Sequence, residues 1–216
     1  ISFINCIAHL CEKIGANIND VSRGLGLDPR IGEQFLQAGL GYGGSCFPKD
    51  TWALITYAKR LGYDFKFLKE VDNVNQDQID YFVKKIIRLS HGSVDHKILT
   101  VFGLSFKPNT DDIRSSAAVD IIRVLQKEGA KIRVYDPQAM KKAKNILKGV
   151  TFCQDAYSVC RDSDCLLVLT EWDEFKHIDF EKVKALMKKP VIFDGRNMLQ
   201  RHIIKAIGFT YFGMGR

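Results

Sequence analysis

The chain has 216 residues, of which 46% are hydrophobic and 26% charged, with a formal net charge of +7. This composition is typical of a soluble globular protein of one or two domains and excludes low-complexity chains. No apolar run approaches the roughly 18–20 residues that span a bilayer, and no signal peptide opens the chain, so we expect no membrane partner.

The basic residues do not form a nucleic-acid site. They are scattered, and their densest cluster, Lys141, Lys142, Lys144 and Lys148, has the spacing of a solvated helix face without interleaved aromatic residues. We therefore predict no nucleic-acid partner. A small anionic substrate would suit the positive charge equally well.

Six cysteines are present, and none belongs to a Cys-x-x-Cys pair, so we predict no metal site. Cys6 and Cys11 lie in an apolar helical pattern and Cys165 opens a strand-like run, so we interpret all three as buried free thiols. Reduced thiols of this kind indicate the cytoplasm. Cys46 differs, because its neighbours are Gly, Ser and Pro.

Residues 1–94 show the apolar spacing of helices. The first stripe consists of Ile4, Ile7, Ala8, Cys11 and Ile14. No capping residue precedes it, which we interpret as a sign that the chain continues a longer protein. Pro48 is suited to a first helical turn, and His91-Gly92 ends a long helix. The further predicted helices are 17–25, 30–38, 48–61 and 72–90.

After residue 95, short β-rich runs alternate with helical stretches. The predicted strands are 97–103, 131–136, 150–153, 165–170, 191–194 and 209–212, and the predicted helices are 115–128, 138–147, 180–187 and 199–207. This alternation indicates an α/β fold with a doubly wound parallel sheet. Ligands of such sheets bind beyond the carboxyl ends of the strands, so we expect one crevice, surrounded by the loops after Gly103, Asp136, Thr170 and Asp194.

The segment 39–44 matches the dinucleotide fingerprint G-x-G-x-x-G by letter. It follows a helix-like segment instead of a strand, so we reject that interpretation. The glycines are expected instead to let the backbone wrap closely around a ligand.

Cys46 lies just before the helix predicted from Pro48, with Lys49 three residues on. The helix dipole and the ammonium group both favour the thiolate over the thiol, which predicts a nucleophile. Asp50 follows one turn later, within reach of a water near Cys46. The alternative is a capped helix start with an incidental cysteine.

Five segments, in this order along the chain, carry a resemblance to a known family. They are Asp28-Pro-Arg-Ile-Gly32 with Phe35-Leu36, Gly41-Tyr-Gly-Gly-Ser-Cys-Phe-Pro-Lys-Asp50, Gly103-Leu-Ser-Phe-Lys-Pro-Asn-Thr-Asp-Asp-Ile-Arg114-Ser-Ser, Thr170-Glu-Trp-Asp-Glu-Phe175 and Phe193-Asp-Gly-Arg196-Asn. Together they resemble the UDP-glucose/GDP-mannose dehydrogenase family over essentially the whole chain. Ser-Cys-Phe-Pro-Lys-Asp is more similar to the UDP-glucose branch than to the GDP-mannose or N-acetylmannosamine branches.

The resemblance implies a domain organisation. Residues 1–94 would form a helical central domain whose long helix builds a homodimer or higher homo-oligomer. Residues 95–216 would form a Rossmann-like, UDP-binding domain. The family's NAD-binding domain, with further catalytic residues, lies upstream of the segment that matches this chain, so we expect the isolated chain to be inactive.

The resemblance also implies an activity, the NAD-dependent four-electron oxidation of UDP-glucose to UDP-glucuronate. By position, Cys46 would attack the aldehyde intermediate, and Asp50 would orient or deprotonate water. Lys49 and Arg114 would touch NAD. The implied substrate-binding residues are Arg30, reaching the substrate of a neighbouring subunit, with Phe35, Leu36, Gln37, Ala38, Gly39, Gly43, Lys107 and Arg196.

Position 37 departs from the family, because Gln replaces the lysine or asparagine that members often carry; backbone contacts would survive this change. The five histidines show no ligand or triad pattern. Two alternatives remain open, a sister dehydrogenase acting on GDP-mannose or a UDP-N-acetylhexosamine, and a nucleotide-sugar-binding module without activity.

Overall fold

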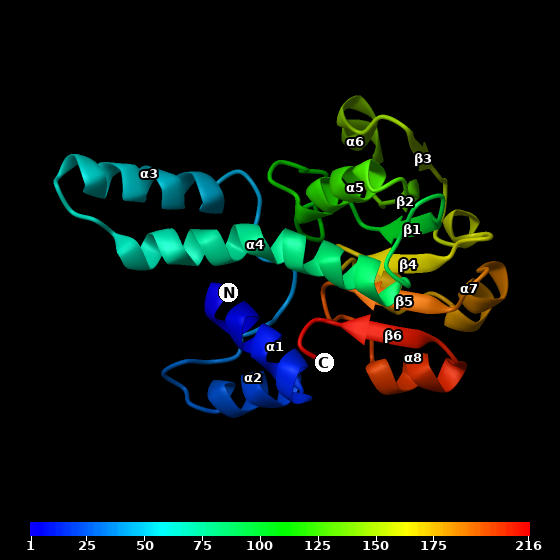
Figure 1. Ribbon diagram of the computed structural model, residues 1–216, viewed down its shortest axis with the longest axis horizontal. Helices are drawn as coiled ribbons and strands as arrows, with labels where there is room; N and C mark the ends of the chain where they lie inside the picture. Colours follow the sequence, from blue (N-terminus) through cyan, green and yellow to red (C-terminus); the bar gives the residue numbers. More distant parts are fainter.

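The computed structural model describes residues 1–216, and its first part is helical. The helices are α1 (Ser2–Ile14), α2 (Ile18–Gly26), α3 (Phe47–Arg60) and α4 (Lys66–Leu89). Helices α3 and α4 form an antiparallel hairpin whose closed end extends away from the sheet, and α1 packs beside α4 (Figure 1). None of the helices combines the length and the apolar character that crossing a membrane requires.

Local sequence signals set most of these helix ends. Gly15, in the left-handed region, ends α1, and Asn17 caps α2 by accepting a hydrogen bond from the Asn19 amide at 3.2 Å. Pro48 lies in the first turn of α3, where its missing N–H costs nothing. These ends agree with the sequence prediction to within one or two residues.

The helix predicted at residues 30–38 is wrong. That segment consists of turns and bends without a helix. Asp28 accepts hydrogen bonds from the amide and the guanidinium of Arg30, and Gly32 has a φ of 71°, so a local turn replaces the first helical turn. Cys6 is also exposed, in contrast to the buried Cys11 and Cys165.

Helix α4 begins at Lys66, earlier than the predicted Asp72. Three of the six added residues, including Phe67, are exposed and none is fully buried, so they form no one-sided apolar stripe for a periodicity argument to detect.

The second part is a six-stranded, fully parallel sheet with the order β3-β2-β1-β4-β5-β6. All six predicted strands are present, as β1 (Ile98–Phe102), β2 (Lys131–Tyr135), β3 (Val150–Phe152), β4 (Cys165–Val168), β5 (Val191–Asp194) and β6 (Thr210–Gly213). The chain builds outward from β1 to β3 and then returns to place β4 beside β1. The strand order therefore reverses between β1 and β4, where doubly wound sheets bind ligands.

Helices cover both faces of this sheet, because residues within each central strand alternate between two buried clusters. One face, carrying Leu99 and Val101, packs against α5 (Ala117–Lys127), α6 (Met140–Ile146) and the last turns of α4. The other, carrying Phe102 and Leu166, packs against α7 (Phe180–Leu186), α8 (Arg201–Ile207) and two 3-10 turns, η1 (Ser158–Cys160) and η2 (Asp173–Lys176). The predicted α/β, doubly wound parallel fold is confirmed.

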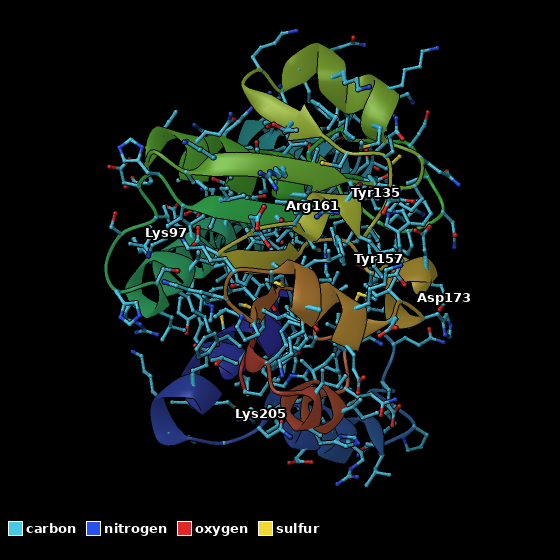
Figure 2. All side chains as sticks on the ribbon, turned by 90° about the vertical axis from the view of Figure 1, so that its right-hand side faces the viewer. Lys97, Tyr135, Tyr157, Arg161, Asp173 and Lys205 are labelled. Atoms are coloured by element: carbon cyan, nitrogen blue, oxygen red, sulfur yellow. The ribbon has the colours of Figure 1, made fainter.

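The two ends of the strands are distinct in Figure 2, where Lys97, just before β1, and Tyr135, at the end of β2, lie on opposite sides. The last turns of α4, with Phe82 and Ile86, belong to the same buried cluster as the sheet. The predicted domain boundary near residue 95 comes just after the end of α4. Because the last turns of α4 pack on the sheet and its first turns do not, the division into two domains at this residue stays a prediction.

Candidate functional site

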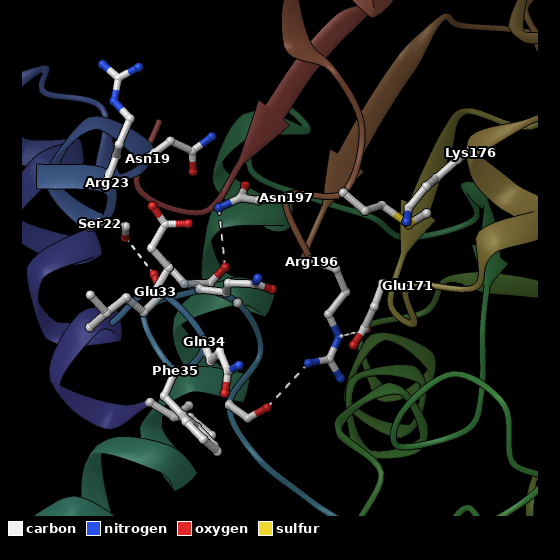
Figure 3. Close-up of a pocket in the computed structure, with 17 residues that line it drawn as sticks. Asn19, Ser22, Arg23, Glu33, Gln34, Phe35, Glu171, Lys176, Arg196 and Asn197 are labelled. Carbon is white, nitrogen blue, oxygen red and sulfur yellow. Dashed lines mark hydrogen bonds and ion pairs between the residues drawn. The ribbon is translucent and has the colours of Figure 1, made fainter. Parts of the chain in front are cut away.

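A cavity of about 670 Å³ opens where the segment before the glycines meets the loops after β4 and β5 (Figure 3). Its lining includes every residue from Phe35 to Gly39 and, from the sheet, Glu171 and Arg196. Of the sequence-predicted substrate residues, six are thus brought together: Phe35, Leu36, Gln37, Ala38, Gly39 and Arg196.

Arg196 connects three segments at this cavity. Its Nε donates to the Leu169 carbonyl at 2.8 Å and lies 3.2 Å from the Glu171 carboxylate. Its Nη1 and Nη2 point to the carbonyls of Gly41 and Phe106, both at 3.4 Å (Figure 3 draws the Glu171 and Gly41 contacts). Long contacts at the two terminal nitrogens leave these donors available to a phosphate, to which guanidinium binds well.

Leu40 attaches the cavity wall to the sheet. Its side chain is buried in the cluster of the sheet core, and Gly195 leaves the space that it fills, since a Cβ there would lie 2.8 Å from Leu40 atoms. Gly39 also lies close to the sheet, because its Cβ would be 3.1 Å from the Gly195 carbonyl. The cavity wall therefore packs, at Gly39 and Leu40, directly against the residue that follows β5.

The glycines at 43 and 44 are required by close packing. A Cβ at Gly43 would lie 2.1 Å from the Ser115 carbonyl, and one at Gly44, where φ is 87°, would lie 2.6 Å from the Phe106 ring. The Gly44 amide donates to the Arg114 carbonyl at 3.1 Å. Close approach thus brings the cysteine segment onto the loop after β1.

Cys46 lies at the start of α3, in the N-cap position, and its side chain is exposed. The Ser45 hydroxyl is 3.7 Å from its sulfur. The Asp50 amide donates to the Cys46 carbonyl at 2.8 Å, and the Asp50 carboxylate forms an exposed ion pair with Lys49 at 2.8 Å. A cysteine, a carboxylate and a cation therefore share one helix end, as the sequence predicted.

Arg114 adds a second cation near Cys46. Asp112 binds its guanidinium at 2.7 Å; hydrogen bonds from Arg114 lower the pKa of Asp112 to about 2. The pKa of Arg114 is raised mainly by Asp112 and further by the nearby charge of Cys46. The pKa of Lys49 is raised mainly by Asp50 and also by Cys46. Cys46 thus contributes, as a minor cause, to the raised pKa of both predicted cofactor-binding residues.

Seven of the predicted site residues lie outside the cavity lining. Arg30 is 87% exposed and pairs with Asp28, so within one chain it reaches no other site residue. Lys107 is exposed beside Phe106, its Nζ 5.5 Å from the centre of that ring. Of the other five, Gly43, Cys46, Lys49 and Asp50 lie on the continuation of the glycine segment, and Arg114 lies in the loop after β1.

Sequence reasoning missed several residues that build this site. Glu171 lies in a quoted segment, but its contact with Arg196 has no sequence signature. Asn197, in the left-handed region, donates to the carbonyls of Ala38 and Met214. No group of three or more His, Cys, Asp or Glu side chains is placed to hold a metal ion.

Comparison with known proteins identifies the family. Residues 1–77 match the central domain of the UDP-glucose/GDP-mannose dehydrogenase family, and residues 100–201 match its UDP binding domain. The chain belongs to this family. The cavity lies between these two matched regions, with lining residues from both.

Individual dehydrogenases resemble the chain over its whole length. It is 48% identical to UDP-glucose 6-dehydrogenase TuaD of Bacillus subtilis, covering 100% of this chain and 47% of that protein. A UDP-glucose dehydrogenase structure from Pyrobaculum islandicum has a TM-score of 0.84 at 32% identity, and an NDP-N-acetyl-D-galactosaminuronic acid dehydrogenase structure from Methanosarcina mazei has 0.86 at 26%; each covers 100% of this chain and 47% of that chain. The chain spans about half the length of the relatives it matches.

Proposed function

We propose that this chain supplies the nucleophile and most of the nucleotide-sugar pocket of an NAD-dependent UDP-glucose 6-dehydrogenase. The proposal rests on the packing of the Cys46 segment against the loop after β1. This segment lies next to the Arg196 cavity, which is at the carboxyl ends of β4 and β5 in the doubly wound sheet. The 48% identity to TuaD supports UDP-glucose as the substrate.

The cavity would hold the nucleotide part of the substrate. The segment from Phe35 to Gly39 presents backbone groups and the exposed Phe35 ring, while Arg196 and Lys107 provide cations for the diphosphate. Arg30, exposed on a turn, would reach the substrate of a neighbouring subunit. Gly43, which packs against the Ser115 carbonyl with no room for a side chain, would present its backbone to the sugar end of the substrate.

The reaction oxidises the sugar's primary alcohol to a carboxylate in two steps. Loss of the first hydride produces an aldehyde, and Cys46 Sγ forms a bond to its carbonyl carbon to give a thiohemiacetal. Loss of the second hydride from that carbon leaves a thioester. Asp50 would direct water to it, breaking the C–S bond, releasing the uronate and returning the thiol.

The residues around Cys46 fit NAD as the cofactor. When bound, NAD accepts one hydride in each oxidation, so two molecules are consumed per uronate. Lys49 and Arg114 are exposed cations near the Cys46 segment, and they would bind the cofactor's diphosphate.

We further propose a homodimer in the cytoplasm. The hairpin of α3 and the first turns of α4 exposes large apolar side chains that water solvates poorly: Trp52, Leu54, Tyr57, Leu61, Tyr63 and Phe67. A second copy, related by a two-fold axis, would cover them. All six cysteines are free, in keeping with a reducing compartment.

The test is an NADH-release assay on the full-length protein with a panel of nucleotide sugars. Two NADH per UDP-glucose, with UDP-glucuronate as the product and GDP-mannose inert, are expected. Turnover of GDP-mannose or a UDP-N-acetylhexosamine instead would assign the protein to another branch of the family. The TM-score of 0.86 to the Methanosarcina mazei structure is the reason to include such sugars in the panel. No turnover of any sugar would leave only a nucleotide-sugar-binding module.

A further inference from the structure

Three side-chain amides from α1 and α4 bind the backbone of the glycine-rich segment, residues 39–44. Asn75 of α4 accepts a hydrogen bond from the Tyr42 amide at 2.8 Å and donates to the Tyr42 carbonyl at 2.9 Å. Gln78, one turn further along α4, donates to the Gly39 carbonyl at 2.6 Å, and Asn5 of α1 accepts from the Gly39 amide at 2.9 Å. Two backbone positions are thus each held through both their donor and their acceptor.

The spacing of these amides matches the spacing of their targets. Residues 75 and 78 are three apart and share one face of α4, as Gly39 and Tyr42 are three apart in the segment above. Gly41 has a φ of 85°, and a Cβ there would lie 2.4 Å from Asn75 Oδ1. The segment therefore lies directly against α4, with no room for a side chain between them.

The amides are buried where polar groups are costly. Asn5 and Gln78 are fully buried, and Asn5 Nδ2 has no hydrogen-bond partner. Gln78 also interacts with His9, where its hydrogen bond opposes the larger effect of burial, which lowers the pKa of His9. An unpartnered buried atom costs about 1–3 kcal/mol relative to a satisfied or apolar one. Apolar replacements would remove that cost at position 5 but would leave the Gly39 amide and carbonyl unpaired, so the amides are needed for the backbone path that they hold.

We propose that Asn5, Asn75 and Gln78 are positioning residues for the active site. Gln78 and Asn5 fix the position of the Gly39 backbone, which lines the proposed nucleotide pocket. Asn75 sets Tyr42, from which the segment runs through Gly43 and Gly44 to Cys46. The inference rests on the proposed function and assigns two separate roles. Gln78 positions the backbone that binds the nucleotide, and Asn75 positions the backbone that leads to the nucleophile.

The test compares Gln78→Met and Asn75→Leu in the full-length protein, with Asn73→Leu as the matched control. Asn73 lies on the exposed side of the same helix and bonds only Glu70. Three readouts are needed: UDP affinity by calorimetry, the melting temperature, and the rate at which iodoacetamide alkylates Cys46. Peptide mass spectrometry follows that rate, with the exposed Cys6 as internal reference.

Gln78→Met is expected to weaken UDP binding about tenfold, the equivalent of about 1.4 kcal/mol, with little change in Cys46 alkylation. Asn75→Leu is expected to change the Cys46 alkylation rate relative to Cys6 while UDP affinity stays close to that of wild type. The control should alter neither. Variants that bind UDP and alkylate Cys46 as wild type does, and differ only in melting temperature, would overturn the proposal.

If Gln78→Met does not fold, Gln78→Asn, which keeps the amide but shortens its reach, makes the same comparison. Weaker UDP binding by this folded variant supports the proposal, and unchanged affinity overturns it. A wild-type protein that binds no UDP would refute the proposed function instead. The effect of Asn75→Leu on Cys46 alkylation would still decide the role of Asn75.

Discussion

Cys46 differs from the buried cysteines in its surroundings. Burial raises the pKa of Cys160 and of Cys165 to about 12, so these thiols stay protonated at neutral pH. Cys46 is exposed at the start of α3, within the fields of Lys49 and Arg114. The physical requirements for a nucleophile, access and nearby positive charge, are met there together.

At this scale we predict that Cys46→Ala in the full-length protein abolishes uronate formation. Without the sulfur no thioester can form, and removal of a nucleophile lowers turnover by at least about 10³. Cys6→Ala, at the other exposed cysteine, should leave the rate unchanged. Product mass spectrometry with UDP-glucose checks both variants, and undiminished uronate from Cys46→Ala would end the assigned role.

Among the elements, the segment from Gly39 to Gly44 owes its path to tertiary contacts instead of hydrogen bonds within itself. Asn5, Asn75 and Gln78 bind it from the helices, and Phe106 and Ser115 limit it from the sheet side. An element held in this way needs glycine where neighbours approach most closely and where φ is positive.

We predict opposite effects of Gly→Ala at two positions. Gly44→Ala should destabilise the protein by about 1–3 kcal/mol, because alanine is strained at a φ of 87° and its methyl group would meet Phe106. Gly24→Ala, in α2 with nothing within 4 Å of its Cβ, should stabilise by roughly 0.5–1 kcal/mol. Urea unfolding measures both, and equal effects at the two positions would contradict the packing argument.

At the scale of the whole molecule, one buried ion pair joins both ends of the chain to α4. Glu12 of α1 binds Lys85 of α4 at 2.5 Å and also accepts from Tyr81 and from the Gly215 amide. Lys85 donates in turn to the Gly213 carbonyl. Both charged side chains are nearly buried, so neither can recover its hydration if the other is removed.

We therefore predict that Glu12→Gln destabilises the fold by about 3–5 kcal/mol, the cost of leaving a buried charge unpaired. The exposed pair of Asp64 and Lys69 offers a control, because Asp64→Asn should cost no more than about 1 kcal/mol. Denaturant unfolding distinguishes the two. A loss of stability from Glu12→Gln as small as that from Asp64→Asn would contradict the proposed contribution of the buried ion pair.

Acid should reduce the contribution of the Glu12–Lys85 ion pair to the stability of the fold. Burial alone would raise the pKa of Glu12, but hydrogen bonds from Lys85, Gly215 and Tyr81 lower it below the ordinary value of 4.5. A depressed carboxyl pKa adds stability that is complete above pH 4.5 and disappears as the pH falls through the folded-state pKa. The stability difference between wild type and Glu12→Gln should thus shrink in acid, and a constant difference from pH 7 to pH 3 would contradict this.

The exposed hairpin gives a prediction about assembly. Trp52→Glu should dissociate the dimer, since a charge replaces an exposed aromatic ring of the apolar surface that we propose is covered. Light scattering after gel filtration reports the mass. The control is Ile146→Glu, at an exposed apolar residue of α6 far from the hairpin (Figure 1). A wild-type monomer, or a Trp52→Glu dimer, would refute this assignment.

The sequence by itself determined the alternation of strands and helices after residue 95, and with it the parallel sheet. It also determined the cysteine at the start of α3, with Lys49 and Asp50 beside it. These features are local, because strand and helix periods and first-turn residues are encoded within a few positions. Only the tertiary structure decided that Leu40 enters the sheet core and that Asn75 and Gln78 hold the glycine segment. Those contacts join residues more than thirty positions apart along the chain, and no periodicity within one segment encodes a partner at that distance.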